Sequence, residues 1–163
     1  MLGANDGIVS TASVVMGVAG ATTETKAIFT AGMAALVAGA LSMAVGEYVS
    51  VSSQRDAEKI DHQNGHLDDE TEFTNPAQAA IASLIAFTIG GLVPFIAVVA
   101  APDALRIPVT VGAVVAALLV TGFGSATVGG ASRARAMLRV ITGGLIAMAV
   151  TYFVGTIFGA TLV

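Results

Sequence analysis

Five long apolar stretches constrain this chain more than any other feature of its sequence. A bilayer core is about 30 Å thick, and an α-helix needs about 20 apolar residues to cross it. The stretches of sufficient length are residues 2–21, 27–53, 76–101, 108–131 and 137–161. Only 11% of the 163 residues are charged, against about a quarter in an average soluble domain. The sequence therefore predicts an all-α membrane protein with five transmembrane helices, forming a single transmembrane domain.

Basic residues are distributed unevenly between the predicted connections. The side that holds the N-terminus carries five and the opposite side two: Arg55, Lys59, Arg133, Arg135 and Arg139, against Lys26 and Arg106. Because basic residues are retained on the cytoplasmic side, this asymmetry predicts a cytoplasmic N-terminus. The membrane would be the plasma membrane in a bacterium and a vacuolar-type membrane in a eukaryote.

The second apolar stretch carries a stripe of small side chains. At helical spacing, one face presents Gly32, Ala35, Gly39, Ser42 and Gly46. Small residues let two helices approach closely within lipid. The stripe predicts a homodimer joined mainly through the first two helices.

A second stripe beside it carries candidate metal ligands. Met43 and Glu47 are one helical turn apart, so they project from the same face. A carboxylate inside a membrane span is unfavourable unless it faces a partner or a water-filled path. A thioether next to a carboxylate offers a soft and a hard donor to one cation, a combination that favours transition metals.

The first apolar stretch also contains an acidic residue, Asp6, near its start. Asp6 shares a helix face with Ser10, and two interpretations are open. Residues 5–7 (Asn-Asp-Gly) form a cap or turn at the membrane edge, or Asp6 is a ligand inside the membrane. In the predicted orientation Asp6 and Glu47 share a depth near the cytoplasmic ends of their helices. Ser10 and Ser42 would then line a pathway beside them.

The connection at residues 55–75 is predicted to be an acidic cytoplasmic loop. It contains seven of the eleven acidic residues and both histidines. His62 and His66, with Asp69 nearby, have the spacing of a helical metal-binding pair. Asn64 and Gly65 form a strong turn signal between them. We therefore expect a solvated loop in preference to an ordered metal site.

Several functional classes lack support in the sequence. There is no cysteine, so no disulfide or thiolate site is expected. No nucleophile–base pair or phosphate-binding loop indicates an enzyme, and no basic patch with interleaved aromatic residues indicates nucleic-acid binding.

Long motifs at residues 3–21 (GANDGIVSTASVVMGVAGA) and 38–58 (AGALSMAVGEYVSVSSQRDAE) give the chain a family resemblance. Together with NPAQAA at 75–80 and the arginine-rich segment 133–144, they resemble the vacuolar iron transporter family, in its nodulin-21-like and bacterial branch. The resemblance implies a dimeric five-helix protein that moves Fe²⁺, and often Mn²⁺, out of the cytoplasm in exchange for protons. The implied path runs near the dimer interface through the first two helices. Asp6 and Met43 match the aspartate and methionine of that path.

Two departures from the vacuolar members accompany this resemblance. Ala35 occupies the position of a path glutamate, and Glu47, in the Gly-Glu-Tyr motif of this branch, is expected to substitute for it. The glutamate-rich cytoplasmic metal-binding domain is replaced by the short 55–75 connection. The leading hypothesis is a secondary transporter of Fe²⁺ or Mn²⁺, with Asp6, Met43 and Glu47 as ligands. The alternative is a non-transporting membrane assembly or scaffold protein in which the two carboxylates form buried interhelical hydrogen bonds.

Overall fold

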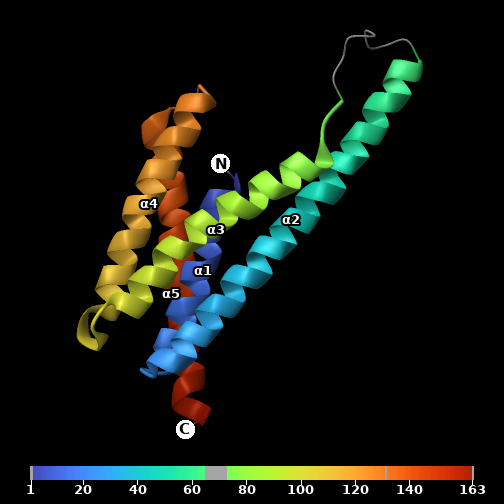
Figure 1. The fold of residues 1–163 in the computed structure, drawn as a ribbon. Helices are drawn as coiled ribbons and strands as arrows, with labels where there is room; N and C mark the ends of the chain where they lie inside the picture. Colours follow the sequence, from blue (N-terminus) through green and yellow to red (C-terminus); the bar gives the residue numbers. More distant parts are fainter. Residues whose placement is uncertain (1, 65–72, 131, 163) are drawn as a thin grey trace.

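The structure, a computed structural model, describes residues 2–64, 73–130 and 132–162. Its elements are α1 (Leu2–Ala21), α2 (Thr25–Gln63), α3 (Pro76–Ala100), the short 3₁₀ helix η1 (Asp103–Leu105), α4 (Arg106–Val128) and α5 (Arg133–Leu162) (Figure 1). Five of these helices are long and apolar enough to cross a membrane. The predicted all-α fold with five spans is therefore confirmed.

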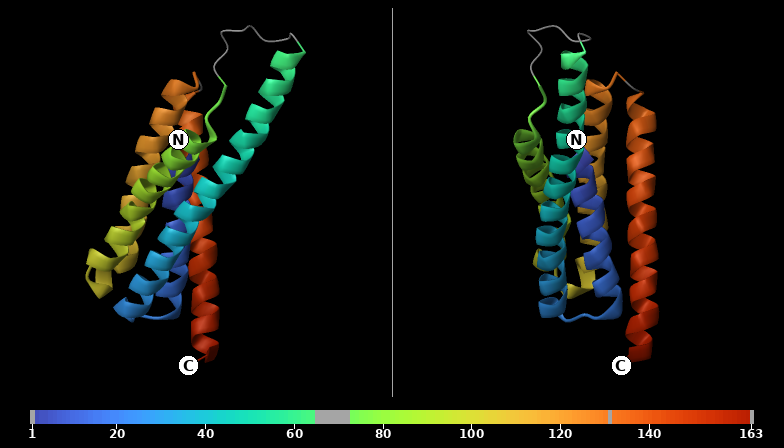
Figure 2. Two further views of the ribbon diagram at one scale, coloured as in Figure 1. Left: turned by 45° about the vertical axis from the view of Figure 1, so that its right-hand side comes forward. Right: turned by 90° about the vertical axis from the view of Figure 1, so that its right-hand side faces the viewer.

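Helix α1 is the centre of the bundle, and each of the other four long helices packs against it (Figure 2). Its buried residues Ile8, Ala12 and Met16 form one core cluster with Val114 and Leu118 of α4 and Met148 of α5. Farther along α1, Val15 packs with Ile28 and Val98. The first helix thus contributes to the core along most of its length.

Glycines allow α1 to contact α3 backbone to backbone. A Cβ atom at Gly7 would lie much closer than 3.0 Å to the Phe87 carbonyl oxygen. A Cβ atom at Gly90 would lie equally close to the carbonyl oxygen of Ala4. The same applies between α1 and α5, where a Cβ at Gly155 would overlap the carbonyl oxygen of Gly17. Helix α3 continues unbroken through Pro94, and Gly90 and Gly91 serve this packing without interrupting the helix.

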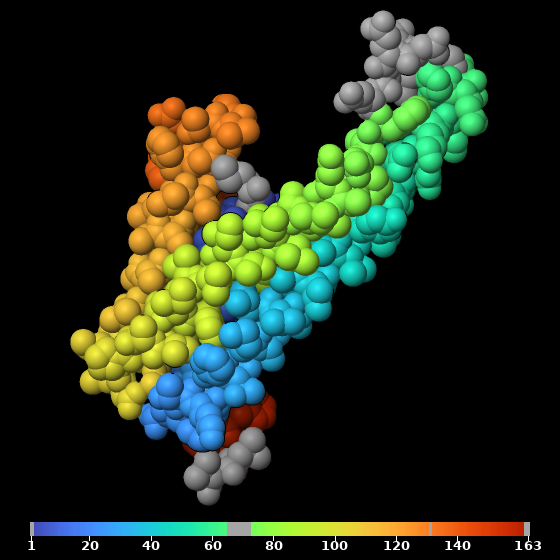
Figure 3. All heavy atoms as spheres, in the orientation of Figure 1, coloured from blue at the N-terminus to red at the C-terminus, as the bar shows by residue number. Residues whose placement is uncertain are grey.

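Two glycines of the small-residue stripe of α2 pack within the protomer. A Cβ at Gly39 would overlap the ring of Phe87, and one at Gly32 would lie 2.8 Å from both Phe95 Cδ2 and Val15 Cγ1. Aromatic side chains of α3 therefore occupy the part of the stripe around these two glycines, which we predicted a second protomer would contact. Of the stripe's glycines, only Gly46 has no neighbour within 4 Å. Figure 3 shows α3 lying along α2 as one continuous packed layer.

Helix α2 extends beyond the predicted span. The span was predicted to end at residue 53, with a loop from residue 55, but the helix continues to Gln63. Ala57, Glu58 and Lys59 are good helix formers, and Lys59 pairs with Asp56 at 3.9 Å. The helix ends at Asn64, the first residue of the predicted turn. With 39 residues, α2 is about 58 Å long and exceeds the bilayer core.

Contacts at both ends of the bundle hold the connections in place. Glu58 Oε2 accepts hydrogen bonds from the Thr74 backbone N–H at 2.9 Å and the Thr74 hydroxyl at 3.1 Å. Asn75 caps α3, with Oδ1 accepting from the N–H groups of Ala77 and Gln78. At the opposite end the buried Arg106 donates to the Thr23 carbonyl oxygen, to Thr25 Oγ1 and to Asp103 Oδ1.

The last two spans also start earlier than predicted. Helix α4 begins at Arg106, two residues before Pro108, and α5 begins at Arg133, four residues before the predicted start at 137. Proline is tolerated in the first helical turn because the N–H groups there have no intrahelical acceptor. Because these first turns begin with charged residues, a prediction based on apolar stretches places the helix starts too late.

Candidate functional site

An open cavity of about 370 Å³ lies between α1, α2 and α3. Its lining includes all five residues predicted as ligands or path-lining groups: Asp6, Ser10, Ser42, Met43 and Glu47. We refer to it as the α1–α2 cavity. Asp6 and Ser42 are exposed, whereas the other three are partly buried. The structure thus places the two predicted stripes, which are far apart in the sequence, around one space.

The helical period explains how these residues meet. Asp6, Ser10 and Val14 follow one another at four-residue intervals on α1, and residues 35–47 of α2 contribute two adjacent rows. Ala35, Gly39 and Gly46 leave the space open because their side chains are small, and the ring of Phe87 on α3 closes its inner end. The polar groups therefore project into a volume that apolar side chains do not fill.

The two carboxylates of the cavity are without protein partners. In the part of the chain that the structure describes, neither Asp6 nor Glu47 accepts a hydrogen bond through its carboxylate or forms an ion pair. The Ser10 hydroxyl donates to the backbone oxygen of Asp6 at 2.6 Å, which leaves the oxygen of Ser10 free to accept or coordinate. Such carboxylates in a membrane span require a cation, protons or water.

The cap interpretation of residues 5–7 is wrong. Helix α1 begins at Leu2, so Asn5 and Asp6 lie inside the helix, beyond the positions whose side chains cap a helix. The Asn5 side chain also has a buried Oδ1 atom for which the described residues provide no hydrogen-bond donor. The polar side chains of Asn5 and Asp6 therefore do not serve as a cap for α1.

The donor set of one protomer is small. Met43 lines the cavity and also packs beside a core cluster formed by Leu36, Ala40 and Phe87. Within residues 2–64, 73–130 and 132–162, no group of three or more His, Cys, Asp or Glu side chains is placed to hold a metal ion. One protomer thus offers two carboxylates, a thioether and hydroxyls, and a bound cation would need further ligands from water or from another chain.

Comparison with known proteins identifies the family. The model of the VIT family matches residues 1–66 and 59–156. The chain belongs to the VIT family. Vacuolar iron transporter homolog 4 of Arabidopsis thaliana is 43% identical over 155 residues, which cover 93% of this chain and 78% of that protein. Vacuolar iron transporter homolog 2 of Arabidopsis thaliana is 44% identical over 161 residues, covering 98% and 82%. Vacuolar iron transporter homolog 5 of Oryza sativa subsp. japonica is 43% identical over 166 residues, covering 99% and 79%.

Family membership and the five spans make this chain a multi-pass integral membrane protein of the VIT family. The position that we expected to carry a glutamate in vacuolar members, here Ala35, lines the α1–α2 cavity. The small Ala35 side chain leaves this part of the cavity open, whereas a glutamate there would add a negative charge. Glu47 is the acidic group that α2 places in the cavity of this VIT-family chain.

The histidine predicted to contact a metal in the loop lies away from the cavity. His62 is near the end of α2, and its ring packs edge-on against Phe73 with centroids 5.7 Å apart. It is fifteen residues beyond Glu47, about 22 Å along the helix axis. The predicted contacts His66 and Asp69 are outside the described residues.

The apolar residues of the site were not predicted from the sequence. Phe87 closes the α1–α2 cavity, and Leu2 and Val14 line it. Phe87 lies in an apolar run whose period does not distinguish it from lipid-facing neighbours, so no signal in that run could have identified it. Val14 lies on the face of Asp6 and Ser10, and this spacing was the available signal.

Proposed function

We propose that this VIT-family protein is a secondary transporter that moves a divalent transition metal, Fe²⁺ or Mn²⁺, from the cytoplasm outward in exchange for protons. The observation that carries the proposal is the α1–α2 cavity, in which two carboxylates without protein partners and a thioether face one space within the membrane spans. The names of the relatives, vacuolar iron transporter homologs, support a metal as the transported species.

The chemistry of the donors suits such a substrate. The carboxylates of Asp6 and Glu47 attract a divalent cation and take up protons when it leaves, so the same groups provide binding and coupling. The Met43 thioether is a soft donor, which favours transition metals over Ca²⁺ and Mg²⁺. Ser10 and Ser42 add neutral oxygen ligands. In this mechanism the residues bind the metal and hold the exchanged protons, and no covalent step is required.

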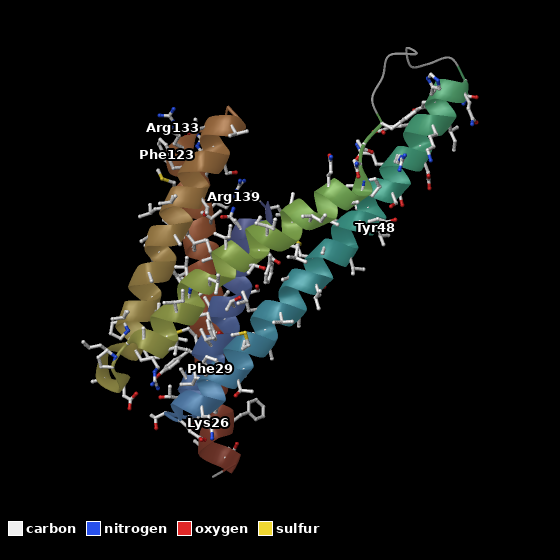
Figure 4. All side chains as sticks on the ribbon, viewed as in Figure 1. Lys26, Phe29, Tyr48, Phe123, Arg133 and Arg139 are labelled. Carbon is white, nitrogen blue, oxygen red and sulfur yellow. The ribbon has the colours of Figure 1, made fainter. Side chains whose placement is uncertain are left out.

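The charges at the two ends of the bundle support the proposed direction. Arg133 and Arg139 lie at the end where α5 begins, and Lys26 lies at the opposite end (Figure 4). Arg133 is held over the Phe123 ring, with its Cζ atom 4.9 Å from the ring centroid. The more basic end would be cytoplasmic, which places Asp6 and Glu47 toward the cytoplasm.

A homodimer would complete the site. The mouth of the cavity is uncovered in one protomer, since Asp6 is exposed, Val14 is 40% exposed and Gly46 has no neighbour within 4 Å. A second copy on this face would shield the carboxylates from lipid and double the number of carboxylates and thioethers around the seam. This dimer would use the mouth of the cavity and not Gly39, which is occupied by Phe87.

The alternative function, a membrane assembly or scaffold protein, assumes that Asp6 and Glu47 form interhelical hydrogen bonds. Neither carboxylate has such a bond among the described residues. No observation favours this alternative over transport, and a flux measurement separates the two.

The proposed function is tested in proteoliposomes that contain the purified protein and a pH-sensitive dye. We expect an imposed Mn²⁺ gradient to drive proton movement in the opposite direction, because each metal ion displaces protons from the carboxylates. Liposomes without protein give the background rate. Mn²⁺ uptake without proton movement would contradict the exchange, and the absence of both would favour the assembly protein.

Replacement of Met43 by leucine tests the role of the thioether. Met43→Leu preserves volume and apolar packing, at a stability change below about 1.5 kcal/mol, but removes the soft donor. We expect Fe²⁺ to lose about tenfold in affinity relative to Mg²⁺. Competition binding of Fe²⁺ against Mg²⁺ without oxygen measures this ratio. Met148→Leu, at a buried methionine outside the cavity, is the matched control, and an equal change in both variants would argue against a ligand role.

A further inference from the structure

Glu47 lines two cavities, and the second one leads away from the α1–α2 cavity. This second cavity has a volume of about 260 Å³ and lies between the start of α1, α2 and the first part of α3. Its lining consists of Leu2, Gly3, Glu47, Ala79, Ala82, Ser83 and Ala86. Leu2 and Glu47 are the residues common to both cavities. We refer to the second one as the α3 portal.

The wall that α3 contributes is a continuous face of small side chains. Ala79, Ala82, Ser83 and Ala86 are spaced i, i+3, i+4 and i+7, the pattern of one helical face. Across the portal α1 contributes Gly3, where a Cβ atom would lie 3.1 Å from the Ser83 carbonyl oxygen and 3.3 Å from Ala86 Cβ. A larger residue at any of these positions would narrow the passage.

The polar groups of the portal point to a cation. Glu47 places at this junction a carboxylate that has no partner among the described residues, and Ser83 adds a hydroxyl. The portal has a volume of about 260 Å³, and each water molecule takes up roughly 30 Å³ in the liquid. Water can therefore accompany a cation at Glu47.

The surroundings of the portal favour cations as well. Its α3 wall belongs to the first half of α3, which lies along the part of α2 that continues to Gln63 (Figures 1 and 3). Within that continuation, the described residues 55–64 carry three acidic and two basic side chains. A net negative charge near an opening raises the local concentration of cations.

We propose that the divalent metal reaches Glu47 through the α3 portal, inside a single protomer, and passes from there into the α1–α2 cavity. The inference rests on the proposed function. It separates the access route from the face that a second copy would cover, because every residue of the portal belongs to one chain. Glu47 is then the group that receives the metal at the junction of the two cavities.

A bulky side chain in the portal tests the route. Ala82 is exposed on α3, so Ala82→Phe adds bulk without displacing core residues. A block in the access route from the cytoplasm slows arrival and departure along that route by the same factor, so equilibrium affinity is unchanged. In nanodiscs, we expect association and dissociation of Mn²⁺ to slow about tenfold or more, with Kd constant within about twofold. Ala116→Phe, the same change at an exposed alanine of α4 outside these cavities, should leave both rates at the parent values.

A second variant introduces the bulk after folding. Because the chain has no cysteine, Ala82→Cys provides a single thiol that a cationic methanethiosulfonate reagent modifies in the assembled protein. Modification should slow Mn²⁺ association about tenfold. Complete modification without a change in rate would overturn the portal, as would equal slowing by Ala82→Phe and Ala116→Phe.

Two outcomes distinguish an error in the portal from an error in the proposed function. If the parent protein binds Mn²⁺ in a Glu47-dependent manner and Ala82→Phe does not change the rates, the portal is wrong and the proposed site stands. If the parent protein does not bind Mn²⁺, the proposed function is wrong and the portal is overturned with it.

Discussion

Glu47→Gln is expected to reduce Mn²⁺-driven flux by about a hundredfold or more. The loss of a group that only orients a metal ligand lowers affinity by about 10- to 100-fold, and Glu47 is proposed as a ligand itself. Glutamine has nearly the same shape but carries no charge, so the packing around α2 is preserved. Proton movement should be lost together with metal movement, because the neutral amide cannot exchange a proton for a cation. Flux in proteoliposomes and calorimetry in two buffers of different ionisation enthalpy measure the two effects.

The control for this experiment is Glu24→Gln, which makes the same change immediately before α2, at the opposite end of the helix from the cavity. It should retain flux near the parent level. The double variant Asp6→Asn/Glu47→Gln provides the sharpest contradiction. If it still binds Mn²⁺ as tightly as the parent protein, the α1–α2 cavity is not the metal site.

Gly7→Ala is expected to destabilise the protein strongly, although it adds only one methyl group. The added Cβ would lie far inside 3.0 Å of the Phe87 carbonyl oxygen and 3.0 Å from the backbone nitrogen of Gly91. Backbone atoms cannot rotate away as a side chain can, so α1 and α3 must separate. Overpacking of this kind typically destabilises a protein by about 1–3 kcal/mol, occasionally more. Because Asp6 precedes Gly7, the displacement should also reduce Mn²⁺ binding.

Gly112→Ala is the matched control, since Gly112 is also helical and has no neighbour within 4 Å. There the exchange should be neutral or stabilising by up to about 1 kcal/mol, because alanine is the better helix former. Unfolding by SDS in mixed micelles, followed by circular dichroism, compares the two variants. Equal stability of Gly7→Ala and Gly112→Ala would show that the α1–α3 contact is looser than the structure describes.

The identity of the spans and the faces of the site residues followed from the sequence. The bilayer requires about 20 apolar residues in a row, a local property that can be read without knowledge of neighbours. The helical period likewise placed Asp6 with Ser10 and Met43 with Glu47, because side-chain direction in a helix depends only on position along the chain. The cap that Asn75 provides for α3 is also local, because an asparagine directly before a proline is typical of a helix start.

Which helix surfaces meet depends on the tertiary structure. A stripe of small residues indicates close packing but not the partner, and Gly32 and Gly39 of α2 contact Phe95 and Phe87 from α3 of the same chain. The central position of α1 and the two cavities that meet at Glu47 depend in the same way on how helices distant in sequence cross. The period of a helix specifies the direction of each side chain, whereas the volume left in front of it depends on side chains from other helices.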